Sequence, residues 1–276
     1  MDRFQKQLLA SRRVLVLAGA GLSAASGLQP FKISGERATW NGVDMADLAT
    51  PEAFAVDPQL VWGFHAERRQ IALAAAPNAA HFALARLTQV LGADRVLTLT
   101  QNEDALSEAA GHPQPALVHM HGELFVARCV DRRCQYSARN FDPELGARSA
   151  PECPRCGAYL RPGVTWFGEA VPFSAIVRAT EAIEDGIDLV MCVGMSADVW
   201  PAAGYIDEIV ARGGTVAVFN QDPGAAPPGA LVFPGNAEQT VPLALEPVVG
   251  KISVAAASES SDLSELSDSY GSTDGL

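Results

Sequence analysis

Four short, almost continuously apolar runs along the chain have the length of buried strands. They cover residues 14–18, 96–99, 189–193 and 215–219. Between them, apolar residues recur at three- and four-residue steps, which predicts amphipathic helices. These stretches are residues 58–75, 78–91 and 172–186. Buried strands that alternate with helices predict an α/β fold, a doubly wound parallel sheet with helices on both faces.

Residues 123–165 break this alternation and suggest an inserted module. The segment has no clear period and contains two cysteine pairs, Cys129 with Cys134 and Cys153 with Cys156. Two such pairs predict a tetrahedral zinc site, which would be structural because no coordination position stays open. Disulfide bonds are the alternative. The fifth cysteine, Cys192, lies within an apolar run and is interpreted as a core residue.

Composition and charge narrow the class of protein. With 276 residues, 48% of them hydrophobic, the chain can build one large domain, which we assign to residues 1–254. A net charge of −12 argues against direct nucleic-acid binding. Residues 255–276 are Ser-rich, with five acidic and no basic residues, and predict a disordered tail. Because no run is long enough to span a membrane or act as a secretory signal, we expect an intracellular protein that binds no membrane.

A loop of small residues follows the first strand. In "GAGLS", residues 19–23, the N–H groups of Gly19, Ala20 and Gly21 are placed where a strand leads into a helix, a common site for phosphate groups. The loop lacks the full dinucleotide-binding fingerprint. Glycines needed only for tight packing between strand and helix are the alternative.

Polar side chains follow two further apolar runs. After the second strand come Gln101, Asn102 and Asp104, at the sheet edge where open α/β proteins bind ligands. Helix capping is the alternative for Asn102 or Asp104. In "HMHGE", His121 follows another short apolar run and is a candidate general base. We interpret three other histidines as structural, namely His81, His112 and His119.

Taken together, these motifs and their order resemble the sirtuin family from about Leu15 to Leu243. The similar segments are "GAGLSAASG", "TQNED", "HMHGE", the four cysteines, "LRPGVTWFGEAVP", "VGMSADVWPAA" and "VFNQD". The resemblance implies a Rossmann-like NAD-binding domain with a small zinc module. It also implies NAD-dependent removal of acyl groups from protein lysines, giving nicotinamide and O-acyl-ADP-ribose.

Roles for individual residues follow from this resemblance. His121 would be the base, Asp104 would hold the nicotinamide carboxamide, Asn102 would orient ribose and water, Gln101 would sit beside the ribose, and Phe31 would cover the ribose. Further cofactor contacts are implied at Gly19, Ala20, Gly21, Ser23, Lys32, Gly194, Ser196, Asn220, Gln221 and Ala237. The acyl-lysine channel would be bordered by Val164, Phe167 and Gly168.

Four departures from the family pattern bear on activity. Pro30 and Lys32 stand where an Asp and an Arg are usual, Glu103 replaces an apolar residue, and Met195 replaces a Thr. Two alternatives stay open. One is transfer of ADP-ribose to protein or water, which the retained His121 and the complete acyl-channel segment disfavour; the other is a weakly active sensor of NAD or ADP-ribose, which Pro30 and Lys32 favour.

The segment 47–69 is similar to the sirtuin branch that removes succinyl and malonyl groups. That branch has Tyr and Arg three residues apart in its acyl pocket, where this chain has His65 and Arg68. A guanidinium there would bind a carboxylate through two hydrogen bonds. The alternative is that Arg68 and Arg69 belong to the polar face of an ordinary helix.

Overall fold

The structure is a computed structural model that describes residues 1–33, 36–195, 202–222, 224 and 226–254. The cofactor contact expected at Ser196 and the tail expected at 255–276 lie outside these ranges. Across the described ranges, no helix has both the length and the apolar character needed to cross a membrane.

Six strands form the main sheet in the order β13-β12-β11-β1-β6-β7, and every neighbouring pair is parallel. The strands are β1 (Val14–Ala18), β6 (Val96–Thr100), β7 (Leu117–His119), β11 (Leu189–Val193), β12 (Thr215–Asn220) and β13 (Leu231–Pro234). The four strands predicted from apolar runs are confirmed. The sequence pattern does not reveal β13, because this edge strand is only half buried and alternates with exposed positions.

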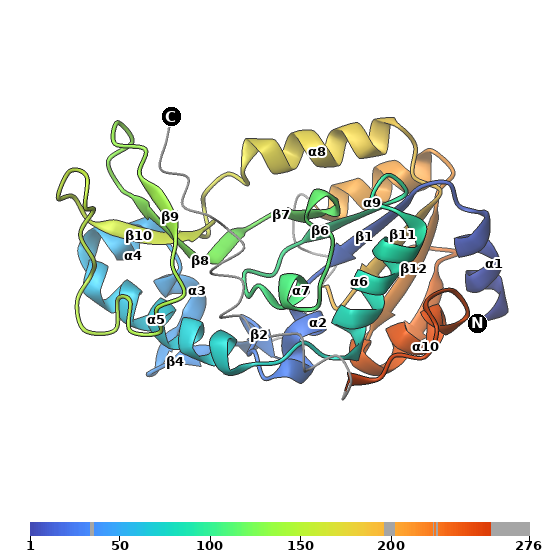
Figure 1. The fold of residues 1–276 in the computed structure, drawn as a ribbon, viewed down its shortest axis with the longest axis horizontal. Coiled ribbons are helices and arrows are strands. Elements are labelled where there is room, and N and C mark those ends of the chain that lie inside the picture. The colour runs from blue at the N-terminus through green and yellow to red at the C-terminus, as the bar shows by residue number, and fades with distance from the viewer. Residues whose placement is uncertain (34–35, 196–201, 223, 225, 255–276) are drawn as a thin grey trace.

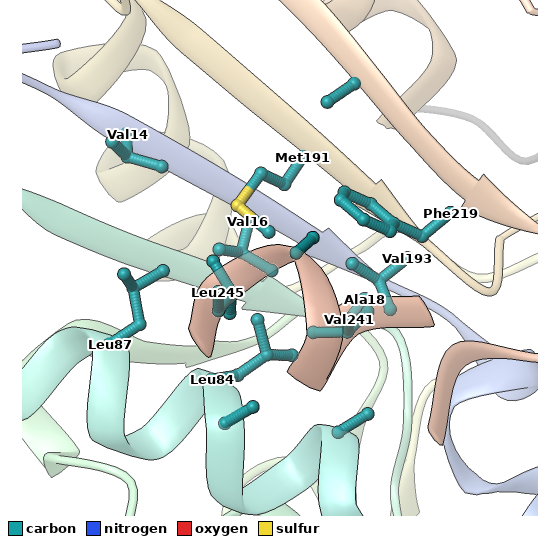
Figure 2. Packing of buried hydrophobic residues seen from close by; sticks show 14 of the residues in the cluster. Val14, Val16, Ala18, Leu84, Leu87, Met191, Val193, Phe219, Val241 and Leu245 are labelled. Carbon is teal, nitrogen blue, oxygen red and sulfur yellow. The ribbon is translucent and has the colours of Figure 1, made fainter. Parts of the chain in front are cut away.

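Helices cover both faces of this sheet (Figure 1). On one face, α1 (Asp2–Ala10), α6 (Ala79–Leu91) and α10 (Ala237–Val249) share a core with Val14 and Val16 of β1. Figure 2 shows Leu84 of α6 and Leu245 of α10 packed beside these valines. On the other face, α8 (Phe173–Glu184) and α9 (Ala202–Ala211) pack over the alternate side chains of the strand. The doubly wound fold is therefore confirmed.

A second unit is built on a three-stranded antiparallel sheet with the order β10-β8-β9. Its strands are β8 (Gly122–Cys129), β9 (Ser137–Arg139) and β10 (Leu160–Val164). Three helices share its core, namely α3 (Met45–Leu48), α4 (Pro51–Val56) and α5 (Pro58–Ala74). Figure 1 shows α4 and α5 beside β9 and β10, away from the main sheet.

The position of α5 differs from the sequence-based expectation, which placed this helix in a layer over the parallel sheet. Trp62 of α5 is fully buried and donates its indole N–H to the carbonyl of Leu160 at 2.7 Å. Arg69 donates to the carbonyl of Leu124 at 2.8 Å. Both acceptors lie in strands of the small sheet, so the small unit contains more of the chain than residues 123–165.

Shorter elements complete the fold. They are α2 (Ala20–Ser23), α7 (Leu106–Ala109), the 3-10 turns Ala24–Ser26 and Gln114–Ala116, and the two-residue strands β2 (Lys32–Ile33), β3 (Glu36–Arg37), β4 (Thr39–Trp40) and β5 (Val43–Asp44).

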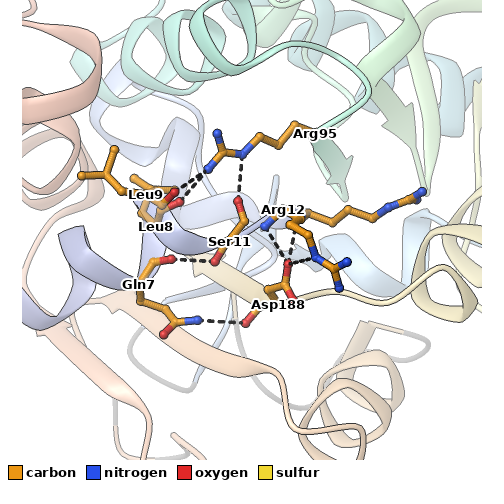
Figure 3. A network of polar contacts seen from close by, with 8 residues as sticks. Gln7, Leu8, Leu9, Ser11, Arg12, Arg95 and Asp188 are labelled. Atoms are coloured by element: carbon orange, nitrogen blue, oxygen red, sulfur yellow. Dashed lines mark hydrogen bonds and ion pairs between the residues drawn. The ribbon is translucent and has the colours of Figure 1, made fainter.

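A polar network fastens α1 to the amino ends of the strands (Figure 3). Arg95 donates to the carbonyls of Leu8, Leu9 and Ser11 at 2.8–3.1 Å, which satisfies carbonyls at the end of the helix. Asp188 accepts the backbone N–H of Arg12 at 2.7 Å. These residues precede their strands, so this edge of the sheet is structural and leaves the opposite edge for ligands.

Candidate active site

The loops that carry the predicted site residues leave the main sheet at one level. Ala18 at the end of β1 pairs with Thr100 of β6 and with Val193 of β11. Thr100 in turn pairs with His119, the last residue of β7. Because the strands are parallel and in register, the loops after them begin side by side at the carboxyl edge of the sheet. The loops with the predicted site residues therefore lie at the carboxyl edge of the parallel sheet, as the sequence predicted.

Glycines in two of these loops allow close backbone contact. Gly19 donates its N–H to the carbonyl of Val193 at 3.0 Å, and Gly21 donates to that of Gly194 at 2.7 Å. A Cβ added to Gly194, whose φ is +58°, would lie 2.4 Å from the backbone of Gly21. The N–H groups of Gly19 and Gly21 are thus bonded within the protein, and the anion cradle expected from Gly19, Ala20 and Gly21 stays a prediction, as does their contact with a cofactor.

Asn102 is held by the first loop. Its side-chain amide donates to the carbonyl of Gly19 at 3.0 Å and to the hydroxyl of Ser23 at 3.1 Å. The hydroxyl of Ser23 also lies 3.3 Å from Nε2 of His81. Since Nδ1 of His81 accepts the backbone N–H of Asn78 at 3.2 Å, Nε2 carries the hydrogen and donates to Ser23. Burial lowers the pKa of His81 to about 3, so this ring is neutral.

Asp104 caps the short helix α7 and faces the same network. Its Oδ1 accepts the N–H of Leu106 at 3.0 Å, so the capping role weighed from the sequence is real for this residue. Burial raises the pKa of Asp104, and a hydrogen bond with Ser23 opposes the shift. The amide of Asn102 has no part in capping, because it turns toward the first loop.

His121 lies between β7 and β8, where the main sheet meets the small unit. Its carbonyl accepts the N–H of Thr165 at 2.7 Å. Burial lowers the pKa of His121, although a hydrogen bond between its ring and the backbone of Gln101 opposes the shift. At neutral pH the ring is therefore uncharged, with one nitrogen held by Gln101 and the other able to take a proton.

The residues expected near adenosine lie at the far end of the same edge. Asn220 donates its side-chain amide to the carbonyl of Met195 at 3.0 Å. Gln221 donates to the side chain of Asn236, which precedes α10. Ala237 begins that helix and is buried. Two of these polar side chains thus brace neighbouring loops.

Aromatic rings cluster beside the turn of α5 that carries Arg68. The rings of Phe31 and Phe167 lie 5.5 Å apart, centre to centre, and the guanidinium of Arg68 lies 4.9 Å from the centre of the Phe31 ring. Phe167 is 52% exposed, whereas Val164 is buried in the core of the small unit. Gly168 has a φ of +83° and open space where a side chain would be.

His65 and Arg68 both present buried N–H groups without a partner. Nε2 of His65 accepts the indole N–H of Trp166 at 3.1 Å, so the hydrogen of the neutral ring is on Nδ1. Within the described part of the chain, that Nδ1 has no hydrogen-bond partner, and neither has Nε of Arg68. Burial, followed by the charge of Arg68, lowers the pKa of His65 well below its usual value. Two donors one helical turn apart are suited to a group that carries acceptors.

Arg69 behaves differently from Arg68. Besides Leu124, it donates to the carbonyls of Asn140 and Asp142 at 2.6 and 3.0 Å. This fully buried side chain holds loops of the small unit together. Neither arginine is the ordinary polar-face residue weighed from the sequence.

The four cysteines of the small unit converge, with their sulfur atoms within 4.8 Å of one another. Cys129 and Cys156 are 3.5 Å apart, and Cys134 and Cys153 are 3.6 Å apart, measured between Sγ atoms. A tetrahedral zinc with Zn–S bonds of about 2.3 Å needs sulfurs about 3.8 Å apart, so the cluster fits zinc. All four are free thiols, which speaks against the disulfide alternative.

Comparison with known proteins identifies the family. Residues 19–201 match the Sir2 family. The chain belongs to this family. It is 34% identical to an NAD-dependent protein deacylase of Candida albicans, over 91% of this chain and 99% of the relative. It is 42% identical to an NAD-dependent protein deacylase of Methylococcus capsulatus, over 79% of this chain and 86% of the relative.

Solved structures of Sir2 proteins agree with this assignment. A crystal structure of a Sir2 homolog–NAD complex superposes with a TM-score of 0.81 at 34% identity, covering 90% of this chain and 93% of that one. A Sir2 protein with a deacetylated p53 peptide and 3′-O-acetyl ADP-ribose gives a TM-score of 0.78 at 25% identity, covering 91% and 99%. The resemblance predicted from the motifs is confirmed.

Some features of this Sir2-family site are not evident from the sequence motifs. His81 contacts the site through its hydrogen bond to the hydroxyl of Ser23. The sequence signal for this role is the position of His81, three residues after the helix cap Asn78. Trp166 fixes the tautomer of His65 from a position far along the chain. Sequence periodicity cannot report a contact between such distant segments.

Proposed function

We propose that this Sir2-family protein is an NAD-dependent protein-lysine deacylase that prefers acyl groups ending in a carboxylate. The relatives named NAD-dependent protein deacylase support the reaction. The observation that supports the preference is the pair of unpartnered donors, Nδ1 of His65 and Nε of Arg68, on one turn of α5.

When bound, NAD supplies the ribose carbon to which the acyl oxygen bonds and the nicotinamide that leaves. The neutral ring of His121 would accept the proton of a ribose hydroxyl, since Gln101 holds its other nitrogen. Asp104 would hold the nicotinamide carboxamide, and its hydrogen bond with Ser23 fixes the side chain in place. The amide of Asn102, tied to the first loop, would orient ribose and water.

Exclusion of water would come from the aromatic residues. Phe31 already contacts Phe167 across the region where the acyl-lysine would enter. A ring over the reacting ribose limits hydrolysis by competing water. The contact between Phe31 and Phe167 would thus serve the reaction by excluding water as well as packing the core.

An acidic acyl group would satisfy both donors of α5. Among the residues that the structure describes, Arg68 has a single hydrogen bond, to the carbonyl of Gln29 at 3.3 Å, and so has donors left for a carboxylate. An acetyl group would leave the Nε of Arg68 and the Nδ1 of His65 unpaired. Burying polar groups without partners costs free energy, which favours the substrate that pairs them.

Analysis of products tests this proposal. The protein is incubated with NAD and one peptide carrying succinyl-, malonyl- or acetyl-lysine, and the products are separated by mass. We expect nicotinamide and O-acyl-ADP-ribose, formed fastest from the acidic acyl peptides. Labelled protein or free ADP-ribose would indicate ADP-ribose transfer instead, and binding of NAD without products would indicate a sensor.

A further inference from the structure

Glu103 is the residue of the second loop that family resemblance leaves unexplained. Its carbonyl accepts the N–H of Leu124 at 2.9 Å, and the carbonyl of Leu124 accepts the side chain of Arg69 at 2.8 Å. The N–H and C=O of one strand residue point to the same side. Glu103 is therefore joined through β8 to the turn of α5 that carries Arg68.

The carboxylate of Glu103 and the guanidinium of Arg68 act on each other electrostatically, and the described residues show no ion pair between them. Oε2 of Glu103 and Nε of Arg68 are both buried and find no hydrogen-bond partner among the described residues. Burial raises the pKa of Glu103 to about 7, and the charge of Arg68 opposes this rise. Glu103 is also the first of the two carboxylates, ahead of Asp104, whose charge acts on Arg68. Two groups of opposite charge, each with a buried unsatisfied atom, thus lie within electrostatic reach of each other, and one of them, Arg68, is the group that the proposed function assigns to the acyl carboxylate.

We propose that Glu103 is a specificity-determining residue of the acyl pocket, an internal carboxylate that competes with the carboxylate of an acidic acyl group for Arg68. This inference rests on the proposed function and deepens it. When Glu103 is ionised, an acidic acyl group meets a like charge and an arginine that is already compensated. Protonated Glu103 removes that repulsion and leaves Arg68 to the substrate.

The competition has a pH signature. The charged groups that act on Glu103 are Arg68 and Asp104, and His65 stays neutral because its pKa lies far below neutral pH. A succinyl carboxylate has a pKa near that of an ordinary Glu, about 4.3, so it is ionised throughout. As the pH rises through about 7, Glu103 ionises, and the preference for succinyl over acetyl peptide should fall.

The test measures kcat/KM for succinyl and acetyl peptides of one sequence between about pH 6 and pH 8. In the wild type, the succinyl-to-acetyl ratio should fall on the order of tenfold over this range. In Glu103→Gln the ratio should be independent of pH and, at the alkaline end, on the order of tenfold above the wild type. Glu67→Gln is the matched control, because Glu67 is exposed and directly precedes Arg68. The glutamine side chain still offers an oxygen that can accept the indole N–H of Trp40.

A ratio in Glu103→Gln that equals the wild-type ratio at the alkaline end, or that still falls with pH, would overturn the inference. Glu103→Leu provides a second variant with an apolar side chain, should the glutamine variant fold poorly. Arg68→Met separates the two proposals. If the wild-type ratio does not depend on Arg68, the proposed acyl preference fails; if it depends on Arg68 but not on Glu103, only the present inference fails.

Discussion

Replacement of Arg68 by Met is the most direct perturbation of the proposed acyl preference. In the wild type the guanidinium of Arg68 lies 4.9 Å from the centre of the Phe31 ring. Met keeps an unbranched apolar side chain beside this ring but removes the charge and the hydrogen-bond donors. Within the described residues Arg68 has one long hydrogen bond, to the carbonyl of Gln29 at 3.3 Å. Glu103, whose charge acts on Arg68, has a pKa raised to about 7 by burial and can take up a proton when the guanidinium is removed, so the loss to the free protein should be small.

The magnitude follows from the donors that the substrate would gain. A hydrogen bond to a charged group contributes about 1.5–3 kcal/mol, which is roughly a tenfold to hundredfold effect. In Arg68→Met, kcat/KM for a succinyl peptide should fall by about that factor, and kcat/KM for the acetyl peptide should change much less. The ratio of the two peptides therefore carries the result.

Steady-state kinetics on peptides of one sequence provide the assay. Arg86→Met is the matched control, because Arg86 lies on α6, is exposed and undergoes the same change of charge and size. Equal kcat/KM values for succinyl and acetyl peptides on the wild type would refute the reasoning. So would a succinyl preference that survives Arg68→Met.

Three other predictions concern the base, the metal and the loop contact. His121→Ala should lower deacylation by about 10² to 10⁴ while calorimetry still detects NAD binding; near-normal turnover would make His121 merely structural. Cys156→Ser should lose zinc and lower the melting temperature, whereas Cys192→Ala should keep its zinc, as the buried Cys192 lies apart from the cluster. If wild-type protein holds no zinc by metal analysis, the metal assignment fails. Gly194→Ala should weaken NAD binding and destabilise the protein, since its Cβ would overlap the first loop; unchanged affinity and stability would contradict the close contact.

Much of the fold is determined by local sequence pattern. The runs that became β1, β6, β11 and β12 are apolar because each strand is covered by helices on both sides, and this property is visible without knowing the partners. Helix α5 could also be predicted from a local pattern, because its apolar residues recur at three- and four-residue steps. The position of the loops after each strand then predicts which edge carries the site.

Tertiary structure decided where α5 packs and what its residues do. A helix shows its apolar face in the sequence but not the surface that this face covers, and Trp62 binds the carbonyl of Leu160 in the small sheet. The tautomer of His65 depends on Trp166 in the same way. Such contacts join segments far apart in the chain, which no local pattern encodes.

The glycine loop and Glu103 show the same division most clearly. The sequence by itself determined that Gly19 and Gly21 follow a strand at the ligand edge, but the acceptors of their N–H groups come from β11 and the loop after it. The resemblance to the family also indicated that Glu103 stands where an apolar residue is usual. That the charge of Arg68 acts on this carboxylate follows only from the tertiary structure. Leu124 of β8 hydrogen-bonds the carbonyl of Glu103 and the side chain of Arg69, and so brings two distant parts of the chain together.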